Sequence, residues 1–264
     1  TPSSFGTHRY LPWVNHPREV ASFLSSSMQV YLCPSPELYP LYHRPNSIVI
    51  IVDIFRASTT MVAAFAHGAK GILPVASTEE AEETGKRLGA LIAAERNVVR
   101  CDFAQLGNDP AEYTTDLVSG REIVFTTTNG TRALTIAREH GAEEILVGAL
   151  TNLHATIDYS QRSGRDVVVL AAGWKGQASM EDMLYAGAFT VEAGATAGDD
   201  TTRMVCDLWQ DHAATLDART EYIKSSEHYV RLEKAGFADC VNYCMSLSLF
   251  DLVLRLEDGW LRVL

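Results

Sequence analysis

A strand, a polar loop and the start of a helix occur twice in this sequence, 73 residues apart. At this offset nine of the 29 positions from Ile50 to Thr78 are identical, including His67-Gly-Ala over His140-Gly-Ala. Each copy runs from an apolar segment through a loop into a helical pattern that ends at a glycine, and a second apolar segment follows. The repeat predicts two related βαβ units in a largely parallel sheet.

The second copy contains Ile123 to Thr135, in which apolar residues end in threonines and Asn129-Gly130 makes a turn before Arg132. Backbone N–H groups, hydroxyls and the positive end of a helix dipole converge at such a turn. The loop is therefore typical of a cradle for a phosphate or sulfonate, onto which an arginine can fork. The candidate anion contacts are Thr127, Thr128, Asn129, Gly130, Thr131 and Arg132.

The first copy has an acid and an arginine where the second has a threonine and an asparagine. Asp53 ends a continuous apolar run of the kind found in central parallel strands, and Arg56 follows it. The Asp53 carboxylate suits Mg²⁺, but it suits equally a helix cap tied to the backbone of Ser58 or Thr59. Arg56 is either an anion contact or the partner of an ion pair with Glu95 or Asp53.

Ligands of an open α/β sheet bind at the carboxyl ends of its parallel strands. Glu95-Arg96 and the segment from Gly173 to Asp182 also follow predicted strands, so they should lie at the same edge as the two loops. Glu181 and Asp182 are candidate metal ligands or a general base, although acids in a helix's first turn are also routine dipole partners. We expect one loop to hold a metal and the two loops together to hold two ends of one substrate.

The bulk composition excludes some classes of partner. A formal net charge of −11 without a lysine or arginine cluster argues against nucleic acid, and no apolar run is long enough to span a membrane. Five cysteines form no dense framework, which favours a reducing, cytoplasmic location. Cys240 and Cys244 lack partners for a zinc set and are expected in the core.

Three histidines are candidates for functional groups. His67 and His140 fall at matching helix ends, which favours a structural role beside the negative end of the dipole. His228 is undecided between a surface helix and the edge of an active site.

The predicted fold class is a layered α/β/α arrangement with a helical C-terminal third. Helices are expected over about 199–216, 219–235 and 238–247, and a hairpin at Glu257-Asp-Gly259. Residues 1–27 show no clear period and are expected to be an N-terminal extension before a single domain over 28–264.

Several segments, taken in order, resemble a known family. They are Val52-Asp53-Ile-Phe-Arg56-Ala-Ser-Thr-Thr60, Ala94-Glu95-Arg96, Leu106-Gly-Asn-Asp-Pro110, Thr126-Thr-Thr-Asn-Gly-Thr-Arg132-Ala and Glu181-Asp182. Together they closely resemble the 2-phosphosulfolactate phosphatase family, known as ComB, over about residues 28 to 250.

The resemblance implies an α/β fold and Mg²⁺-dependent hydrolysis of 2-phospho-3-sulfolactate to 3-sulfolactate and phosphate, a step of coenzyme M biosynthesis. The candidate catalytic residues within these motifs are Asp53, Arg56, Glu95, Glu181 and Asp182, of which Asp53, Glu181 and Asp182 are the candidate Mg²⁺ ligands. Further candidate substrate contacts are Ser58, Thr59, Arg96 and Asn108, besides the loop over 127–132. The expected partner is a small-molecule substrate, a phosphorylated sulfonate. Whether the chain forms a homo-oligomer is left open by the sequence.

The chain departs from the family pattern at two places. The family usually has Gly-Phe-Asp before Leu-Gly-Asn-Ser-Pro, whereas this chain has Phe103-Ala104-Gln105 and then Asp109 in the position of the serine. Because the acid is missing, a catalytic role for Gln105 is not expected. Its absence favours a shifted arrangement of ligands in this chain.

Three alternatives remain on sequence grounds. The substrate could be another small phosphorylated 2-hydroxy acid, or the chain could be a non-catalytic anion-binding protein. A phosphatase of the haloacid dehalogenase kind is disfavoured, because Phe55 occupies the position of the second aspartate. Attack by water and an aspartyl phosphate on Asp53 are both compatible with the motifs.

Overall fold

The computed structural model describes residues 28–96, 98–127 and 129–264, so the predicted extension over 1–27 lies outside the described residues. Within them, eleven strands form one sheet in the order β5-β4-β6-β3-β11-β10-β7-β2-β8-β1-β9. The strands are β1 Gln29–Cys33, β2 Ile48–Val52, β3 Gly71–Pro74, β4 Leu91–Arg96, β5 Val99–Arg100, β6 Glu122–Thr126, β7 Glu144–Gly148, β8 Val167–Ala171, β9 Thr196–Ala197, β10 Leu254–Glu257 and β11 Trp260–Val263. The predicted α/β class with a largely parallel sheet is confirmed.

The sheet consists of two parallel parts joined by an antiparallel hairpin. Strands β4, β6 and β3 form one part, and β7, β2, β8, β1 and β9 form the other. The hairpin of β10 and β11, predicted from Glu257-Asp-Gly259, pairs with β7 on one side and with β3 on the other. Its position was not predicted, because a local turn signal does not say which distant strand edges the hairpin will cover.

The predicted repeat is visible in the elements themselves. Helix α2 spans Ala57–Ala66 and α5 spans Gly130–Glu139, so adding 73 to the bounds of α2 gives those of α5. Strand β2 pairs with β7, and β3 pairs with β6, so each unit begins in one part of the sheet and ends in the other. This exchange brings the starts of α2 and α5 to the same edge.

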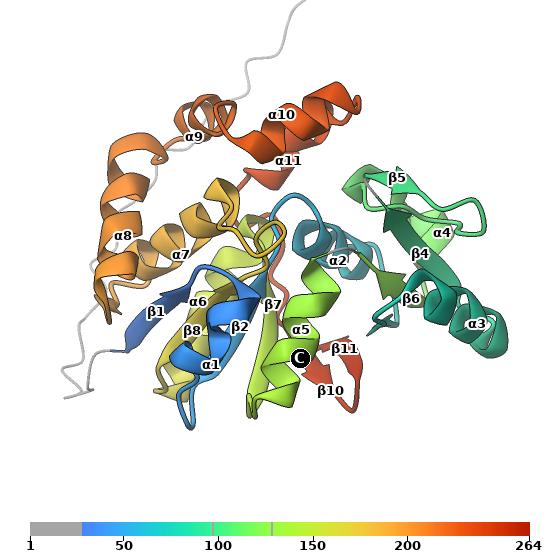
Figure 1. Cartoon of the computed structure of the whole chain (residues 1–264), viewed down its shortest axis with the longest axis horizontal. Helices are drawn as coiled ribbons and strands as arrows, with labels where there is room; N and C mark the ends of the chain where they lie inside the picture. The colour runs from blue at the N-terminus through green and yellow to red at the C-terminus, as the bar shows by residue number, and fades with distance from the viewer. Residues whose placement is uncertain (1–27, 97, 128) are drawn as a thin grey trace, which may run out of the picture.

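The remaining helices are α1 Tyr39–Tyr42, α3 Thr78–Leu88, α4 Thr115–Val118, α6 Leu153–Ser163, α7 Met180–Glu192, α8 Asp200–His212, α9 Leu216–Ile223, α10 Glu227–Lys234 and α11 Val241–Cys244, with short 3₁₀ turns between some of them. In Figure 1, helices α9, α10 and α11 lie together above the edge at which β2 and β8 end. Helix α3 and strands β4 and β5 lie at the opposite end of the sheet from β1.

The helix predicted over 219–235 is wrong, because the chain forms two helices there. Helix α9 ends at Ile223, and the Ser226 hydroxyl accepts a hydrogen bond from the Tyr229 N–H at 3.0 Å, which starts α10. Serine is a strong N-cap residue, so it begins a new helix where the apolar period alone suggests continuity. This break sets the position of His228 in the first turn of α10.

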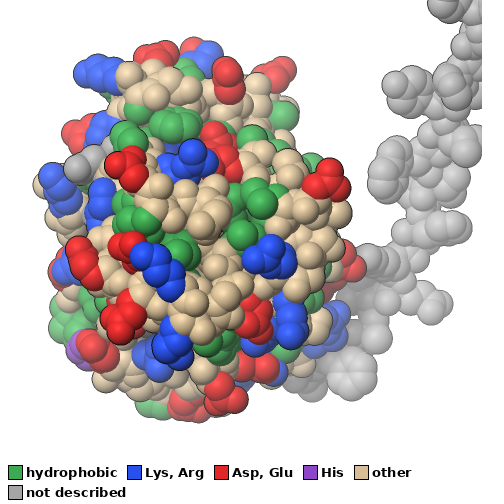
Figure 2. All heavy atoms as spheres, turned by 90° about the vertical axis from the view of Figure 1, so that its right-hand side faces the viewer, with side chains coloured by type: hydrophobic (Ala, Val, Ile, Leu, Met, Phe, Trp, Pro, Cys, Tyr) green, Lys and Arg blue, Asp and Glu red, His purple; other side chains and the backbone are tan. Residues whose placement is uncertain are grey.

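The surface carries charge of both signs. Figure 2 views the end of the molecule formed by α3, β4 and β5, where acidic and basic side chains are interspersed. In the described part of the chain, no helix is both long enough and apolar enough to cross a membrane.

Candidate active site

A small cavity lies where the loops after β2, β4, β6 and β8 meet helix α10. Its volume is about 20 Å³, which is room for roughly one water-sized group. Its lining residues are Asp53, Phe55, Arg56, Glu95, Val98, Asn108, Thr127, Asn129, Trp174, His228 and Leu232. Six of the candidate site residues are therefore brought together here, namely Asp53, Arg56, Glu95, Asn108, Thr127 and Asn129, and so is His228, which the sequence left undecided.

Asp53 directly follows β2 and is 7% exposed. Its carboxylate accepts a hydrogen bond from the Ala57 N–H at 3.3 Å, so it partly caps α2, although the sequence suggested the backbone of Ser58 or Thr59 as the donor. Burial raises the pKa of Asp53 to about 6, while the charge of His228 and the Ala57 N–H oppose that rise. The carboxylate thus lies in a dry environment where a cation would stabilise its charged form.

Other acids surround Asp53 closely enough to affect its ionisation. The charges of Glu181 and Glu95 both add to the rise in the pKa of Asp53. Glu181 is 1% exposed, and its Oε1 lies 2.5 Å from His228 Nδ1, while its Oε2 has no hydrogen-bond partner. The cluster therefore combines negative charge with one carboxylate oxygen that is still available.

Asp182 holds loops together. Its Oδ1 accepts a hydrogen bond from the Ile54 N–H at 2.8 Å, and its Oδ2 accepts from the Gly173 N–H at 3.1 Å and the Ser179 hydroxyl at 2.8 Å. Burial, followed by the charges of Glu181 and Asp53, raises the pKa of Asp182 well above its ordinary value. Asp182 thus joins the loops after β2 and β8 to the first turn of α7.

We expect Asp182→Ala to lower the free energy of unfolding by about 3 kcal/mol without added metal, because it leaves two buried N–H groups without an acceptor. Urea unfolding in EDTA at pH 7.5 measures this change. Glu181→Gln is the matched control from the same helical turn, and we expect it to cost less than about 1 kcal/mol because it keeps an oxygen for His228. If Asp182→Ala left metal-free stability unchanged, the structural role would be wrong.

Arg56 lies at the N-cap position of α2 and is 2% exposed. Its Nη1 lies 3.6 Å from Asp109 Oδ2, and its guanidinium carbon lies 4.2 Å from the centre of the Phe237 ring. Arg56 therefore forms an ion pair with Asp109, the residue that departs from the family pattern, whereas the sequence suggested Glu95 or Asp53 as the partner.

The first residues of α2 and α5 approach one another closely. A Cβ atom built on Gly130 would lie 3.0 Å from the Ala57 Cβ and 3.1 Å from Asp53 Oδ2. Two positive helix ends therefore meet beside the Asp53 carboxylate, which favours an anion at this point. Any larger side chain at position 130 would occupy that space.

Unpartnered buried polar atoms are concentrated around this edge. Five such atoms belong to Arg56, Asn108, Thr126, Thr127 and Glu181, among ten in the described residues. Buried polar groups are normally hydrogen-bonded, and exceptions are characteristic of sites that bind an ion or a polar ligand.

Several predicted contacts have structural partners instead. The Ser58 hydroxyl accepts from the Asp53 N–H, while the hydroxyls of Thr59 and Thr131 donate to the carbonyls of Ile54 and Thr127. These hydroxyls fasten the two loops and are not part of the cavity lining.

Arg132 does not line the cavity. It lies in the first turn of α5, its side chain is about half exposed, and it forms an ion pair with Glu37. The prediction that Arg132 forks onto a bound anion is therefore not supported, because neighbouring Thr131 and Ala133 take the inward positions of that helical turn.

Arg96 and Gln105 are engaged with the backbone. Arg96 Nη1 donates to the Glu95 carbonyl at 2.7 Å, and Gln105 Oε1 accepts from the Ile92 N–H at 2.8 Å. Thr128 lies outside the described residues.

Sequence reasoning left His228 undecided and missed the aromatic side chains that pack against it at this site. His228 packs edge-on against Phe55, with ring centroids 5.8 Å apart, and lies 5.9 Å from the centroid of Trp174. Trp174 directly follows Gly173 at the end of a predicted strand, and this position could have indicated that it lies near the site. The contact of His228 with Glu181 could not be predicted from local patterns, because it joins residues 47 positions apart.

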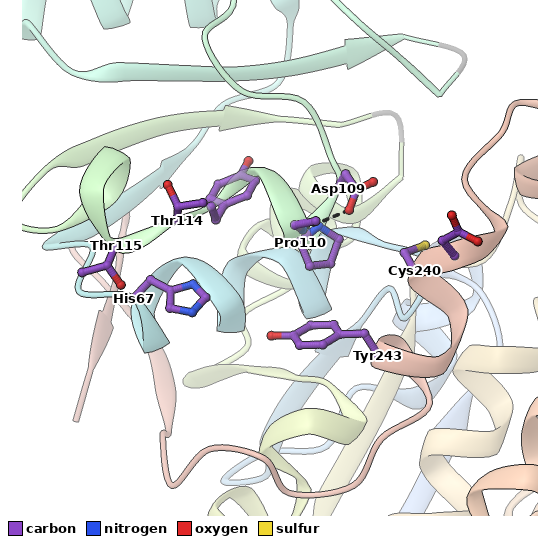
Figure 3. A pocket seen from close by; sticks show the side chains of 10 residues that line it. His67, Asp109, Pro110, Thr114, Thr115, Cys240 and Tyr243 are labelled. Atoms are coloured by element: carbon purple, nitrogen blue, oxygen red, sulfur yellow. Dashed lines mark hydrogen bonds between the residues drawn. The ribbon is translucent and has the colours of Figure 1, made fainter.

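A larger cavity lies elsewhere. It has a volume of about 410 Å³, and Figure 3 shows that it is bordered by His67, the segment from Asp109 to Thr115, and Cys240 and Tyr243. Of the predicted metal ligands it contains none, and its lining is mostly apolar. We therefore place the candidate site at the smaller cavity, where the acids, Arg56 and the helix ends meet.

The residues present fit a divalent cation only in part. Among the described residues, no three His, Cys, Asp or Glu side chains are grouped as a ready metal site. Asp53 and Glu181 nevertheless offer buried carboxylate oxygens in a cluster whose mutual repulsion a hard cation would relieve. Asp182 fits less well because both of its oxygens already accept hydrogen bonds.

Strand-end acids, an arginine and two helix ends facing one cavity are typical of α/β enzymes that act on phosphate esters. A family model described as 2-phosphosulpholactate phosphatase matches residues 33–259. The chain belongs to the 2-phosphosulfolactate phosphatase family, which is a family of phosphoric monoester hydrolases, the enzyme class predicted from the sequence.

Individual relatives agree with this assignment. A protein of Caldanaerobacter subterraneus subsp. tengcongensis named "Probable 2-phosphosulfolactate phosphatase" is 34% identical over 220 residues, covering 81% of this chain and 89% of the relative. Proteins with the same name are 36% identical in Thermotoga maritima, over 80% of this chain and 89% of the relative, and 29% identical in Clostridium perfringens, over 82% and 89%.

Proposed function

We propose that this chain is a Mg²⁺-dependent phosphatase that hydrolyses 2-phospho-3-sulfolactate to 3-sulfolactate and phosphate. The observation that carries the proposal is the placement of Asp53, Arg56 and the starts of α2 and α5 around one buried cavity. The names of the relatives support this identity of the substrate. The pathway that we expect to use such a reaction is coenzyme M biosynthesis.

Asp53 and Glu181 are the residues that would hold Mg²⁺, and the bound ion would supply Lewis-acid polarisation of a phosphoryl oxygen. Glu95 adds to the negative charge that a cation would balance, since its charge acts on Asp53. We omit Asp182 from the ligand set because its oxygens accept hydrogen bonds from three donors.

The phosphoryl group would meet donors from both repeated units. Arg56 from the first unit, Thr127 and Asn129 from the second, and Asn108 from the connecting segment all line the cavity. Together with the two helix ends they would stabilise charge on the transferring group, which is the main demand of phosphoryl transfer. The two-loop clamp predicted from the sequence thus remains the proposed mode of binding, with Arg132 removed from it.

His228 is our candidate for the general acid that donates a proton to the departing alcohol. Hydrolysis of the P–O bond converts the ester oxygen to a hydroxyl, so a donor beside it accelerates the step. Glu181 fixes the imidazole through Nδ1 at 2.5 Å, while the ring packs between Phe55 and Trp174. These aromatic rings would also keep bulk water from the cavity.

The deciding experiment is release of phosphate from 2-phospho-3-sulfolactate by EDTA-treated protein, with and without added Mg²⁺. We expect turnover to fall at least ~100-fold in EDTA and to return with Mg²⁺, because removal of the cation leaves the acid cluster facing an anionic substrate. Full turnover in EDTA would exclude the metal role. Absence of turnover with this ester and with 2-phospholactate would favour the non-catalytic alternative.

A further inference from the structure

A second cavity adjoins the candidate active site on the far side of His228 and Trp174. Its volume is about 200 Å³, and it lies between the segment Trp174 to Glu181 and the start of α10. Trp174 and His228 line both this cavity and the small one beside Asp53. The two spaces are therefore separated by these two side chains.

Arg231 provides a cation in the second cavity. Its guanidinium carbon lies 4.1 Å from the centre of a Trp174 ring, which fixes its orientation, and its buried Nε has no hydrogen-bond partner. Burial lowers the pKa of the Arg231 guanidinium, an effect opposed by the charges of Glu181 and Glu227. An anion bound here would supply the acceptor that Nε lacks and would favour the charged guanidinium.

Two acids line this cavity together with Arg231. Glu181 is hydrogen-bonded to His228 through Oε1 while its Oε2 has no hydrogen-bond partner, and Glu227 is exposed to solvent. Among the described residues, no carboxylate lies within ion-pair distance of Arg231. Neutral donors are also present in the lining, including the side chain of Gln177.

The size of the two cavities bears on how a substrate would be placed. The small cavity has room for roughly one water-sized group, so a substrate that reacts beside Asp53 must place most of its atoms outside this cavity. In 2-phospho-3-sulfolactate the carboxylate is attached directly to the carbon that carries the phosphate, whereas the sulfonate is one bond further away. The sulfonate is therefore the group that can extend further from the phosphate, toward the cavity on the other side of His228 and Trp174.

We propose that the second cavity is a sulfonate subsite in which the Arg231 guanidinium binds the substrate group remote from the phosphate. This inference rests on the proposed function for the identity of the substrate. It assigns Arg231 a role in specificity, and it explains why a cation of α10 faces inward beside the candidate active site.

The test compares Arg231→Met with the wild-type protein on 2-phospho-3-sulfolactate and on 2-phospholactate, which lacks the sulfonate. We expect kcat/KM to fall about 10- to 100-fold for the sulfonated ester and less than about 3-fold for phospholactate, because hydrogen bonds to charged groups have that size. Lys234→Met, on the exposed side of the same helix, is the control and should change neither value. An equal loss for both esters would overturn the proposal and indicate that Arg231 only supports the fold.

A binding measurement separates this proposal from the proposed function. The thermal shift caused by 3-sulfolactate and by lactate is recorded for wild type and for Arg231→Met. We expect 3-sulfolactate to stabilise the wild type more than lactate does, and the difference to vanish in the variant. That result in a protein without turnover would support the subsite and refute the phosphatase function, whereas turnover without a difference between the two ligands would refute the subsite alone.

Discussion

Asp53→Asn is expected to lower kcat for phosphate release at least ~1,000-fold at saturating Mg²⁺. The substitution keeps the size of the side chain and an oxygen for the Ala57 N–H, but it removes the charge that would bind the cation or attack phosphorus. Initial rates of phosphate release measure the loss. A variant with more than a tenth of wild-type kcat would exclude both roles for Asp53.

The same variant has an expected effect on stability that shows whether it is folded. Because the pKa of Asp53 is raised to about 6 in the folded protein, its ionisation costs stability at pH values above 6 and costs nothing below its ordinary pKa of 3.8. Asp53→Asn should therefore be roughly 1–3 kcal/mol more stable than wild type at pH 7.5 in EDTA. This advantage should shrink as the pH falls from 6 to 4.

Ser58→Ala is a suitable control for Asp53→Asn, since Ser58 touches the same residue from the helix. It removes the hydroxyl that accepts the Asp53 N–H at 3.1 Å but leaves the carboxylate in place. We expect it to lose about 1 kcal/mol of stability and to keep kcat within about tenfold of wild type. A loss as large as that of Asp53→Asn would mean that loop geometry, and not the carboxylate, limits turnover.

Arg56→Lys is expected to lower kcat about 100-fold with a smaller change in KM. Lysine keeps the charge but cannot fork onto two phosphoryl oxygens, and it loses the stacking on Phe237. Arg56→Met, which removes the charge, should lose about 1,000-fold, because stabilisation of the transferring group is of that order for arginines at such sites. Steady-state kinetics of phosphate release separate the changes in kcat and KM.

Asp109→Asn distinguishes a direct role of Arg56 from an effect through its ion pair. It removes the carboxylate that lies 3.6 Å from Arg56 Nη1 and leaves the guanidinium in the cavity lining. If Arg56 contacts the substrate, this variant should stay within about tenfold of wild-type kcat. A loss matching that of Arg56→Met would instead make the ion pair the functional unit.

Local patterns predicted the parts of this protein that depend on nearby residues. The apolar run before Asp53 became the buried strand β2, and the glycines that end the two repeated helical patterns follow α2 and α5 directly after their last turns. The repeat predicted that the loops after β2 and β6 are alike, since equal spacing of apolar residues and glycines produces equal units.

Interactions between distant segments could not be predicted in this way. The hairpin of β10 and β11 joins the two parts of the sheet, and the pairing of Arg56 with Asp109 depends on how the 109–115 segment packs beside α2. Arg132 was predicted as an anion contact because it follows the Asn129-Gly130 turn. Its position in the sequence did not determine the direction of its side chain, which forms an ion pair with Glu37 and does not line the cavity.

The sequence by itself determined that two βαβ units bring polar loops, with Asp53 and Arg56 in one of them, to the same edge of a sheet. The spacing of apolar residues was sufficient, because strand and helix periods are local properties. Only the tertiary structure decided that His228 and Arg231 join this edge, at which the sequence already placed Glu181. Both residues come from α10, whose position depends on packing of the C-terminal helices over the loops, and no local period encodes that packing.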